Sequence, residues 1–187
     1  MDRHGFRAQL LALDLDDRSD EEPIRARMLE LLEGTPDCFL RTAFPAHFTG
    51  SALVVNADGT RALLHHHRKL DRWLQFGGHC DGDEDLLRVA GREAEEESGL
   101  TSLIVASARP FDLDIHEIPA HGSEPGHEHF DVRYVFIAPA GGVPITSAES
   151  HDLRWFTAEE MNQLPLDPGL QRMVRKWLQL QARRRGH

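Results

Sequence analysis

Residues 78–100, GHCDGDEDLLRVAGREAEEESGL, constrain the rest of the chain more than any other segment. They open with a glycine-rich acidic loop and continue with a run that we expect to be helical over about 84–98, ending at Gly99. At about 3.6 residues per turn, three carboxylates share one face of that helix: Glu93, Glu96 and Glu97. Like charges at this spacing repel one another, so this face is either solvated or neutralised by a cation.

The overall charge of the chain bears on whether this acidic face is solvated or binds a cation. The chain has 21 basic and 31 acidic residues, a formal net charge of -10. This balance argues against binding of a nucleic-acid polymer, which normally requires a basic patch or stripe. An anionic substrate would need a metal or a local Arg/Lys cluster to offset the repulsion. Hard divalent ions such as Mg²⁺ take oxygen ligands and bind through a few carboxylates plus substrate phosphates.

The length and composition predict a globular protein without a membrane partner. A chain of 187 residues with 40% hydrophobic and 28% charged residues fits one domain with a small extension. Cys38 and Cys80 do not indicate a disulfide framework, so we expect a reducing compartment. No apolar run reaches the length of a membrane span, and the N-terminus lacks a secretory pattern. The expected location is the cytoplasm.

Residues 1–46 read as a helical N-terminal extension, and residues 47–187 as the main domain. Apolar residues at helical spacing predict two helices in the extension, separated by an acidic turn over 14–22. We expect the second helix to end at Gly34. The apolar positions are Phe6, Leu10, Leu11, Leu13, Ile24, Met28, Leu31 and Leu32. Three roles are open to the extension: a packed cap, part of a homodimer contact, or a segment that closes over a ligand.

The main domain alternates predicted strands and helices. Strands are expected at 51–56, 61–67, 73–76, 101–108, 111–118, 130–138 and 153–156. The Asp-Gly pair in NADGT predicts a hairpin between the first two. The alternation in 111–118 predicts a strand with one solvated face, and 119–126 reads as a loop. Thr157 and Glu160 resemble a capping box, and an amphipathic helix follows from 168 to about 183. The fold class is α/β.

The acidic segment resembles the signature of the Nudix family, G-x5-E-x7-R-E-U-x-E-E-x-G-U, in which U is aliphatic. The chain supplies every fixed position, and Ala94 is a small version of the first U. The matching positions are Gly78, Glu84, Arg92, Glu93, Ala94, Glu96, Glu97, Gly99 and Leu100. The order of strands and helices extends the resemblance over roughly 48–165. Phe76 stands where many relatives have proline, which leaves the shape of the entry loop open.

The resemblance implies an α/β/α sandwich on a mixed β-sheet and Mg²⁺- or Mn²⁺-dependent hydrolysis of a diphosphate bond. The substrate would be a small nucleoside diphosphate linked to another group, such as a nucleotide sugar, a dinucleotide or a nucleoside triphosphate. By the same resemblance Glu93, Glu96, Glu97 and the carbonyl of Gly78 would hold the metal. Arg92 would pair with a carboxylate of the signature, and Glu84 would support it. Such a reaction depends on positioning and charge neutralisation.

The general base has several candidates in the sequence. Glu96 or Glu97 could activate water directly. Glu149, just before the last strand, or Glu128 could do so from a later loop.

Basic residues and histidines supply candidate substrate contacts. Arg68 precedes the Gly-Gly pair, together with Lys69 and Arg72. These residues either contact substrate phosphates or are simply the charged residues of a hairpin turn. Arg133 lies within an apolar strand and requires a partner there, a phosphate or an acidic side chain. His129 belongs to a histidine-rich set that either contacts substrate or is structural, since no HExxH or paired Cys/His zinc spacing is present.

Two other functions compete with hydrolysis. An isoprenoid diphosphate isomerase-like activity would need a catalytic cysteine and glutamate in matching contexts, which are not evident. A non-catalytic nucleotide-sensing module would be favoured by loss of the signature carboxylates, and none is lost.

Overall fold

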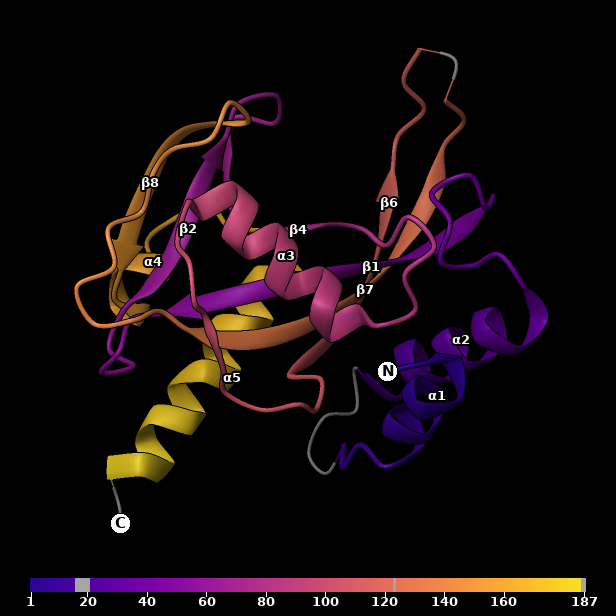
Figure 1. Cartoon of the computed structure of the whole chain (residues 1–187), viewed down its shortest axis with the longest axis horizontal. Coiled ribbons are helices and arrows are strands. Elements are labelled where there is room, and N and C mark those ends of the chain that lie inside the picture. The colour runs from indigo at the N-terminus through magenta and orange to yellow at the C-terminus, as the bar shows by residue number, and fades with distance from the viewer. Residues whose placement is uncertain (16–20, 123, 186–187) are drawn as a thin grey trace. The chain divides into compact units, whose positions relative to one another are not determined.

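The structure, a computed structural model, describes residues 1–15, 21–122 and 124–185 (Figure 1). Contacts divide the chain into two compact units. Unit 1 comprises Met1–Ser51, Gly77–Ala90 and Ser107–Tyr134, and unit 2 comprises Ala52–Phe76, Gly91–Ala106 and Val135–His187. Residues 16–20 of the predicted acidic turn, residue 123 of the predicted loop and the terminal residues 186–187 lie outside the described part.

Eight strands are hydrogen-bonded in one mixed sheet, in the order β3-β2-β1-β7-β5, with β4 paired to β1, β6 to β7 and β8 to β2. Their bounds are β1 (Ala46–Val55), β2 (Ala62–His67), β3 (Arg72–Leu74), β4 (Phe76–His79), β5 (Ile104–Val105), β6 (Asp112–Ile118), β7 (His127–Ile137) and β8 (Ser150–Phe156). The helices are α1 (Arg3–Leu11), α2 (Glu21–Gly34), α3 (Leu86–Ser98), α4 (Ala158–Met161) and α5 (Pro168–Arg185). The predicted α/β class is confirmed.

In unit 1 the two N-terminal helices pack as a cap. Helix α1 lies against α2 (Figure 1). Helix α2 also contacts β6. The Phe6 ring is fully buried and meets the Phe48 ring edge-on at 5.3 Å between centroids. The predicted packed cap is therefore confirmed, whereas the homodimer contact stays a prediction. Leu11 departs from the expected apolar face, because it is 52% exposed.

Strands β6 and β7 of unit 1 form a long antiparallel pair in which Asp112 lies opposite Arg133 and Asp114 opposite Asp131. The prediction that the aspartate face of 111–118 is solvated was wrong. Asp112 is 1% and Asp114 9% exposed, because the guanidinium of Arg133 ion-pairs with both. Alternating polar and apolar residues show which face of a strand is polar, not whether that face is exposed, and here the polar face is buried.

The Gly77-Gly78 pair lies within strand β4 rather than in the predicted loop. A Cβ atom at Gly77 would collide with the Ser51 side chain and lie 3.0 Å from the carbonyl oxygen of Gly50. Glycine here permits close approach of two backbones within unit 1, which is one of its regular uses in strands.

Unit 2 is built around antiparallel pairing of β2 with β3 on one side and β8 on the other. The predicted hairpin before β2 is confirmed, since the Asn56 N–H donates to the Arg61 carbonyl at 2.9 Å. Thr157 caps α4 with a complete capping box to Glu160, as expected. The strand expected over 101–108 is shorter in the structure and covers only Ile104–Val105. Just before it, the Leu103 N–H donates to the side-chain carboxylate of Glu95 at 3.3 Å.

Among the residues that the structure describes, none of the helices has both the length and the apolar character needed to cross a bilayer. The two thiols, Cys38 and Cys80, are free and buried. Burial raises the pKa of Cys38 to about 11 and that of Cys80 further, so both stay protonated.

Candidate active site

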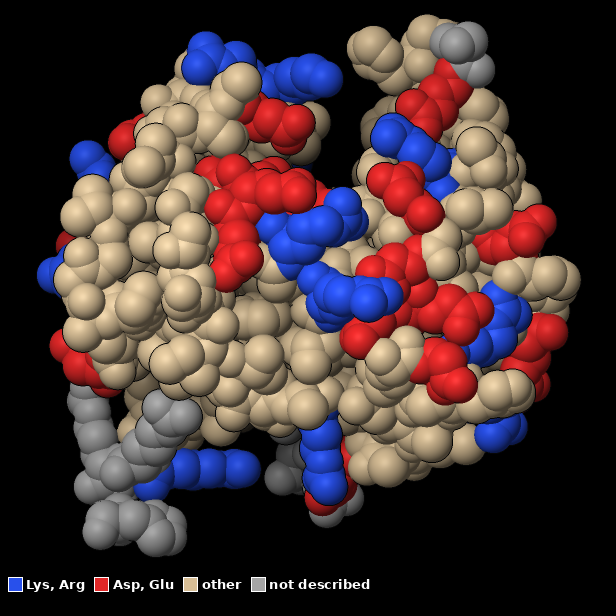
Figure 2. Space-filling model, in the orientation of Figure 1, with Lys and Arg blue, Asp and Glu red and all other residues tan. Residues whose placement is uncertain are grey.

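Helix α3 carries the glutamates of the signature, as the spacing predicts. The guanidinium of Arg92 forms an ion pair with Glu93 at 2.9 Å, which confirms the expected pairing with a carboxylate of this set. Glu97 is only 8% exposed, whereas Glu96 is exposed. In Figure 2 acidic side chains gather over the position that α3 occupies in Figure 1. The helix therefore presents oxygen donors at its surface with one of them held by an arginine.

The end of α3 is fixed at Gly99. Its N–H donates to the Glu95 carbonyl at 3.0 Å, and its φ of 67° lies in the left-handed region that side chains rarely adopt. The Ile145 N–H donates to the Ser98 carbonyl at 2.7 Å, so a later loop of unit 2 is tied to this end. The last turn, which contains Glu96 and Glu97, is thus held by backbone contacts.

Arg68 and Glu149 come together in unit 2 where β2 and β8 begin to diverge. The Arg68 N–H donates to the Glu149 carbonyl at 2.8 Å. The Arg68 guanidinium donates to the carbonyls of Ala148 at 3.1 Å and Ser150 at 2.9 Å. The Glu149 side chain itself is exposed. Arg68 therefore contacts the chain on both sides of Glu149, a structural contact that sequence reasoning did not anticipate.

Two histidines of β2 face the same stretch of β8. His65 is 2% exposed, and its Nδ1 lies 2.9 Å from the Ser150 hydroxyl oxygen. Burial, with a smaller contribution from His67, lowers the pKa of His65 to about 4, so this imidazole is neutral. Burial also lowers the pKa of His67, and the charge of Glu149 opposes that shift.

Gly78 and Glu84, the first two positions of the signature, lie in unit 1. Glu84 accepts from the backbone N–H of Arg3 at 2.9 Å and lies 3.7 Å from its guanidinium. The Arg3 side chain also donates to the carbonyl of Leu32 at 3.0 Å. Glu84 thus joins the loop before α3 to the N-terminal cap.

Arg133 occupies a buried polar network of unit 1. It contacts Asp131 at 2.7 Å, Asp114 at 2.9 Å and Asp112 at 3.2 Å, and Asp131 in turn accepts from the Ser51 hydroxyl at 2.7 Å. Burial alone lowers the pKa of Arg133, but the three carboxylates outweigh it and raise the pKa above its ordinary value. Of the two partners expected for Arg133, acidic side chains are present. Its contact with substrate stays a prediction.

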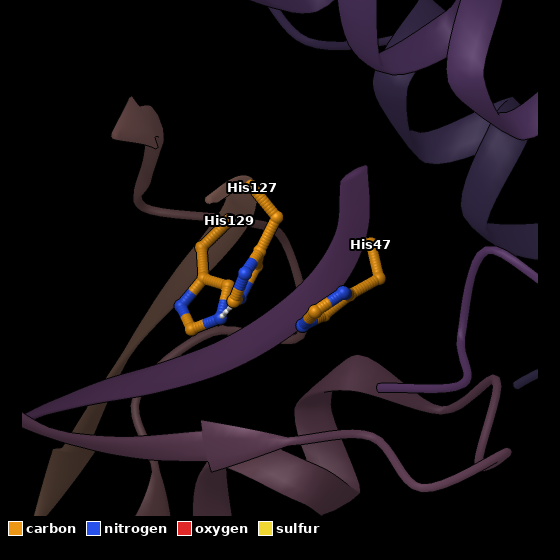
Figure 3. Close-up of side chains that lie close together, drawn as sticks. All are labelled: His47, His127 and His129. Carbon is orange, nitrogen blue, oxygen red and sulfur yellow. Dashed lines mark hydrogen bonds between the residues drawn. The ribbon is translucent and has the colours of Figure 1, made fainter. Parts of the chain in front are cut away.

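The remaining predicted residues also lie in unit 1. Glu128 is bound by Arg27 at 2.6 Å, so this candidate base is engaged in a surface ion pair. His129 belongs to a histidine cluster with His47 and His127, whose rings approach one another from β1 and β7 (Figure 3). Burial and neighbouring imidazoles lower the pKa of His129 to about 2, so it is neutral.

Sequence reasoning missed His47. It precedes the apolar stretch from which the first strand was expected, and it meets His127 and His129 through the pairing of β1 with β7. The available signal was the H-x-H spacing of His127 and His129, since residues two apart in a strand point to the same face.

The donor set on α3 fits a hard divalent cation. Carboxylate oxygens are the ligands that Mg²⁺ and Mn²⁺ prefer, and Glu93, Glu96 and Glu97 supply them on one helix of unit 2. Arg92 orients one donor without neutralising the whole set.

Comparisons with known proteins identify the family to which the sequence is similar. The sequence model described as "NUDIX domain" matches residues 47–177. A "Putative 8-oxo-dGTP diphosphatase 3" of Mycobacterium tuberculosis is 31% identical over 137 residues, covering 68% of this chain and 60% of the relative. The chain thus spans 60% of the length of that curated relative.

Solved structures show the same fold. A Nudix hydrolase from M. smegmatis, RenU, superposes with a TM-score of 0.54 at 23% identity, covering 73% of this chain and 86% of that one. An Ap4A hydrolase from C. elegans superposes with a TM-score of 0.53 at 18% identity, covering 72% and 97%. At these identities the likeness concerns the fold alone.

Proposed function

Because this chain belongs to the Nudix family, we propose that it is a divalent-metal-dependent pyrophosphohydrolase acting on small nucleotide derivatives. The observation that carries the proposal is the presence of Glu93, Glu96 and Glu97 together on α3, with Arg92 ion-paired to Glu93 at 2.9 Å. A module that only senses nucleotides would be free to lose these residues.

The proposed metal ligands are Glu93, Glu96 and Glu97, with the carbonyl of Gly78 as a further donor. When bound, Mg²⁺ or Mn²⁺ offsets the charge of the substrate phosphates and lowers the pKa of a bound water. Arg92 holds the Glu93 side chain in one orientation. Less side-chain entropy is therefore lost when the glutamates become ordered around the metal.

We assign the general base to Glu149, with Glu96 or Glu97 as the alternative. Glu149 lies in the same unit as these glutamates and is exposed, whereas Glu128 is in unit 1 and paired with Arg27. In the proposed reaction Glu149 takes a proton from water as the water oxygen bonds to phosphorus. The bridging P–O bond breaks, and the leaving phosphate group carries away the bond electrons.

The substrate class follows from charge and from the relatives. A protein with a formal net charge of -10 needs a metal to accept a polyanion. The named relatives act, by their names, on 8-oxo-dGTP and on Ap4A. We therefore propose a nucleoside triphosphate, a dinucleotide or a nucleotide sugar as substrate. The free thiols suit a reducing cytoplasm, where we expect the reaction to occur.

The test is a panel of these compounds, including 8-oxo-dGTP and Ap4A, incubated with Mg²⁺ or Mn²⁺ and with or without chelator. We expect release of phosphate or pyrophosphate that the chelator abolishes. Glu97→Gln should lower turnover by about 100-fold or more, as loss of a transition-state electrostatic contact does. Glu95→Gln is the matched control on the same helix and should retain turnover.

The hydrolase proposal would be overturned if no compound of the panel is turned over, or if Glu97→Gln retains full turnover. Tight binding of a panel member without turnover would instead support the sensing module.

A further inference from the structure

Five imidazole rings gather in unit 1: His47, His79, His116, His127 and His129. The His47 ring lies 4.9 Å from that of His127 and 4.8 Å from that of His129, measured between centroids. The His127 and His129 rings are 5.0 Å apart. One ring nitrogen from each of these three residues lies within 4.8 Å of the others. Figure 3 draws the three side chains close together.

Two of the three rings are held through Nδ1 by backbone carbonyls. His47 Nδ1 lies 3.1 Å from the Ala43 carbonyl oxygen, and His127 Nδ1 lies 3.0 Å from that of Pro125. A carbonyl only accepts, so each Nδ1 carries the proton and each Nε2 presents a lone pair. Metal-binding histidines are typically fixed in this way by a carbonyl behind the ring.

The spacing of the nitrogens suits a shared cation. His127 Nε2 and His129 Nε2 are hydrogen-bonded at 3.2 Å, and because His127 Nε2 accepts, His129 Nε2 carries the proton that a cation would displace. Two nitrogens bound to Zn²⁺ at about 2.0–2.1 Å with a tetrahedral angle are separated by about 3.3 Å. The third nitrogen, from His47, lies within 4.8 Å of the other two and would have to move closer to share the ion.

His47 supplies an independent sign of a missing partner. The residue is fully buried, and its Nε2 has no hydrogen-bond partner among the described residues. Leaving a buried polar atom unpaired destabilises the folded state, so such atoms are rare and call for an explanation. A cation at the centre of the three rings would satisfy this lone pair.

The backbone supports this arrangement from both strands. The Glu128 N–H donates to the Pro45 carbonyl at 2.8 Å, which fixes the start of β7 beside the start of β1. His127 and His129 flank Glu128 and share one face of β7. The three donors therefore sit on paired strands, which hold ligands more accurately than loops do.

We propose that His47, His127 and His129 of unit 1 form a binding site for a borderline transition-metal ion such as Zn²⁺, with a donor set chemically unlike the glutamates of α3. Neutral imidazole suits Zn²⁺, Cu²⁺ and Ni²⁺, whereas Mg²⁺ prefers oxygen. Three protein ligands leave a fourth position open to water or a substrate group. His79 and His116 flank the site, with rings 5.1 Å and 5.4 Å from that of His129.

The direct test uses the full chain without added histidines, stripped of metal and titrated with Zn²⁺ against a chromophoric chelator. We expect one equivalent bound with a Kd of about 1 µM or tighter, in the presence of excess Mg²⁺. His47→Gln and His129→Gln should each weaken binding by at least about 100-fold, the upper end of what loss of a supporting partner costs. His4→Gln, an exposed histidine of α1 outside the cluster, should bind as the parent does.

A second measurement needs no variant. Zn²⁺ added to the parent protein should shift the imidazole ¹⁵N resonances of His47, His127 and His129 and leave that of His4 unchanged. The proposal is overturned if the parent binds no equivalent of Zn²⁺, if the His47→Gln or His129→Gln variants retain it, or if these resonances do not move. None of these readouts depends on hydrolysis, so the site at α3 and this one are tested separately.

Discussion

The backbone N–H of Arg68 donates to the carbonyl of Glu149 at 2.8 Å, and its guanidinium reaches the carbonyls of Ala148 and Ser150. The arginine expected to contact phosphate thus holds the backbone around the carboxylate proposed as base. Because the guanidinium is a rigid fork with several donors, lysine cannot reproduce both side-chain contacts.

Replacing Arg68 should therefore lower the rate more than the substrate affinity. We expect Arg68→Ala and Arg68→Lys to reduce kcat about 10-fold with little change in KM, since misplacement of a catalytic group costs rate. Steady-state kinetics with the best panel substrate provide the measurement, and Arg175→Ala, at an exposed position of α5 in the same unit, is the control. A rise in KM at constant kcat would instead assign Arg68 to the phosphates.

Loss of Arg133 should destabilise the protein strongly at neutral pH. Arg133→Met leaves Asp112, Asp114 and Asp131 buried without their shared cation, and breaking such a network costs about 3–5 kcal/mol. Urea unfolding at pH 7 measures this loss.

The matched control is Arg88→Met, which removes an exposed arginine paired with Asp83 at 2.6 Å. We expect little change there, because water screens and solvates both partners. Equal effects of the two substitutions would show that the buried network contributes nothing specific.

His65 should make the protein less stable as the pH falls. Its pKa is lowered to about 4 in the folded state, from an ordinary value of 6.5, so between these values the unfolded chain binds the extra proton. The free energy of unfolding should then decrease by up to about 1.4 kcal/mol per pH unit from pH 6.5 down to 4, and the effect is absent above that range.

This contribution can be isolated with His65→Asn, whose side-chain amide takes the place of Nδ1 opposite Ser150. The stability gap between parent and variant, measured by urea unfolding, should narrow as the pH falls from 7 to 5. His151→Asn, at an exposed position of the same unit, serves as control. A gap that stays constant with pH would refute the assignment to His65.

A methyl group at Gly77 should not be tolerated. In Gly77→Ala the Cβ collides with the Ser51 side chain and presses on the Gly50 carbonyl, so we expect a loss of about 1–3 kcal/mol from overpacking. Thermal unfolding measures this loss. Adding Ser51→Gly should restore part of it, whereas Gly34→Ala, which meets nothing within 4 Å, should not destabilise the protein.

Local spacing predicted the part of the site that lies on one element. The glutamates, Arg92 and the Gly99 stop follow from helical periodicity within a single segment, and the structure places them on α3 as expected. The hairpin before β2 and the capping box at Thr157 are likewise encoded within a few residues.

What the sequence could not supply depends on pairing between distant strands. Asp112 and Asp114 looked solvated because Arg133, 21 and 19 residues away, faces them only once β6 pairs with β7. His47 meets His127 only through the pairing of β1 with β7. From the sequence alone, Gly77 looks like a loop residue. Its role in a strand depends on the backbone of Gly50, which lies beside it in the fold.

The Phe6–Phe48 contact bears on how this protein can be shortened. The region shared with the family begins at residue 47, yet the ring of Phe48 is covered by Phe6 and stacks on Phe39 at 5.3 Å. Cutting the chain at that boundary would leave an aromatic surface in water and deprive Glu84 of its contact with Arg3. The shortest fragment worth expressing is therefore longer than the fragment that relatives have in common.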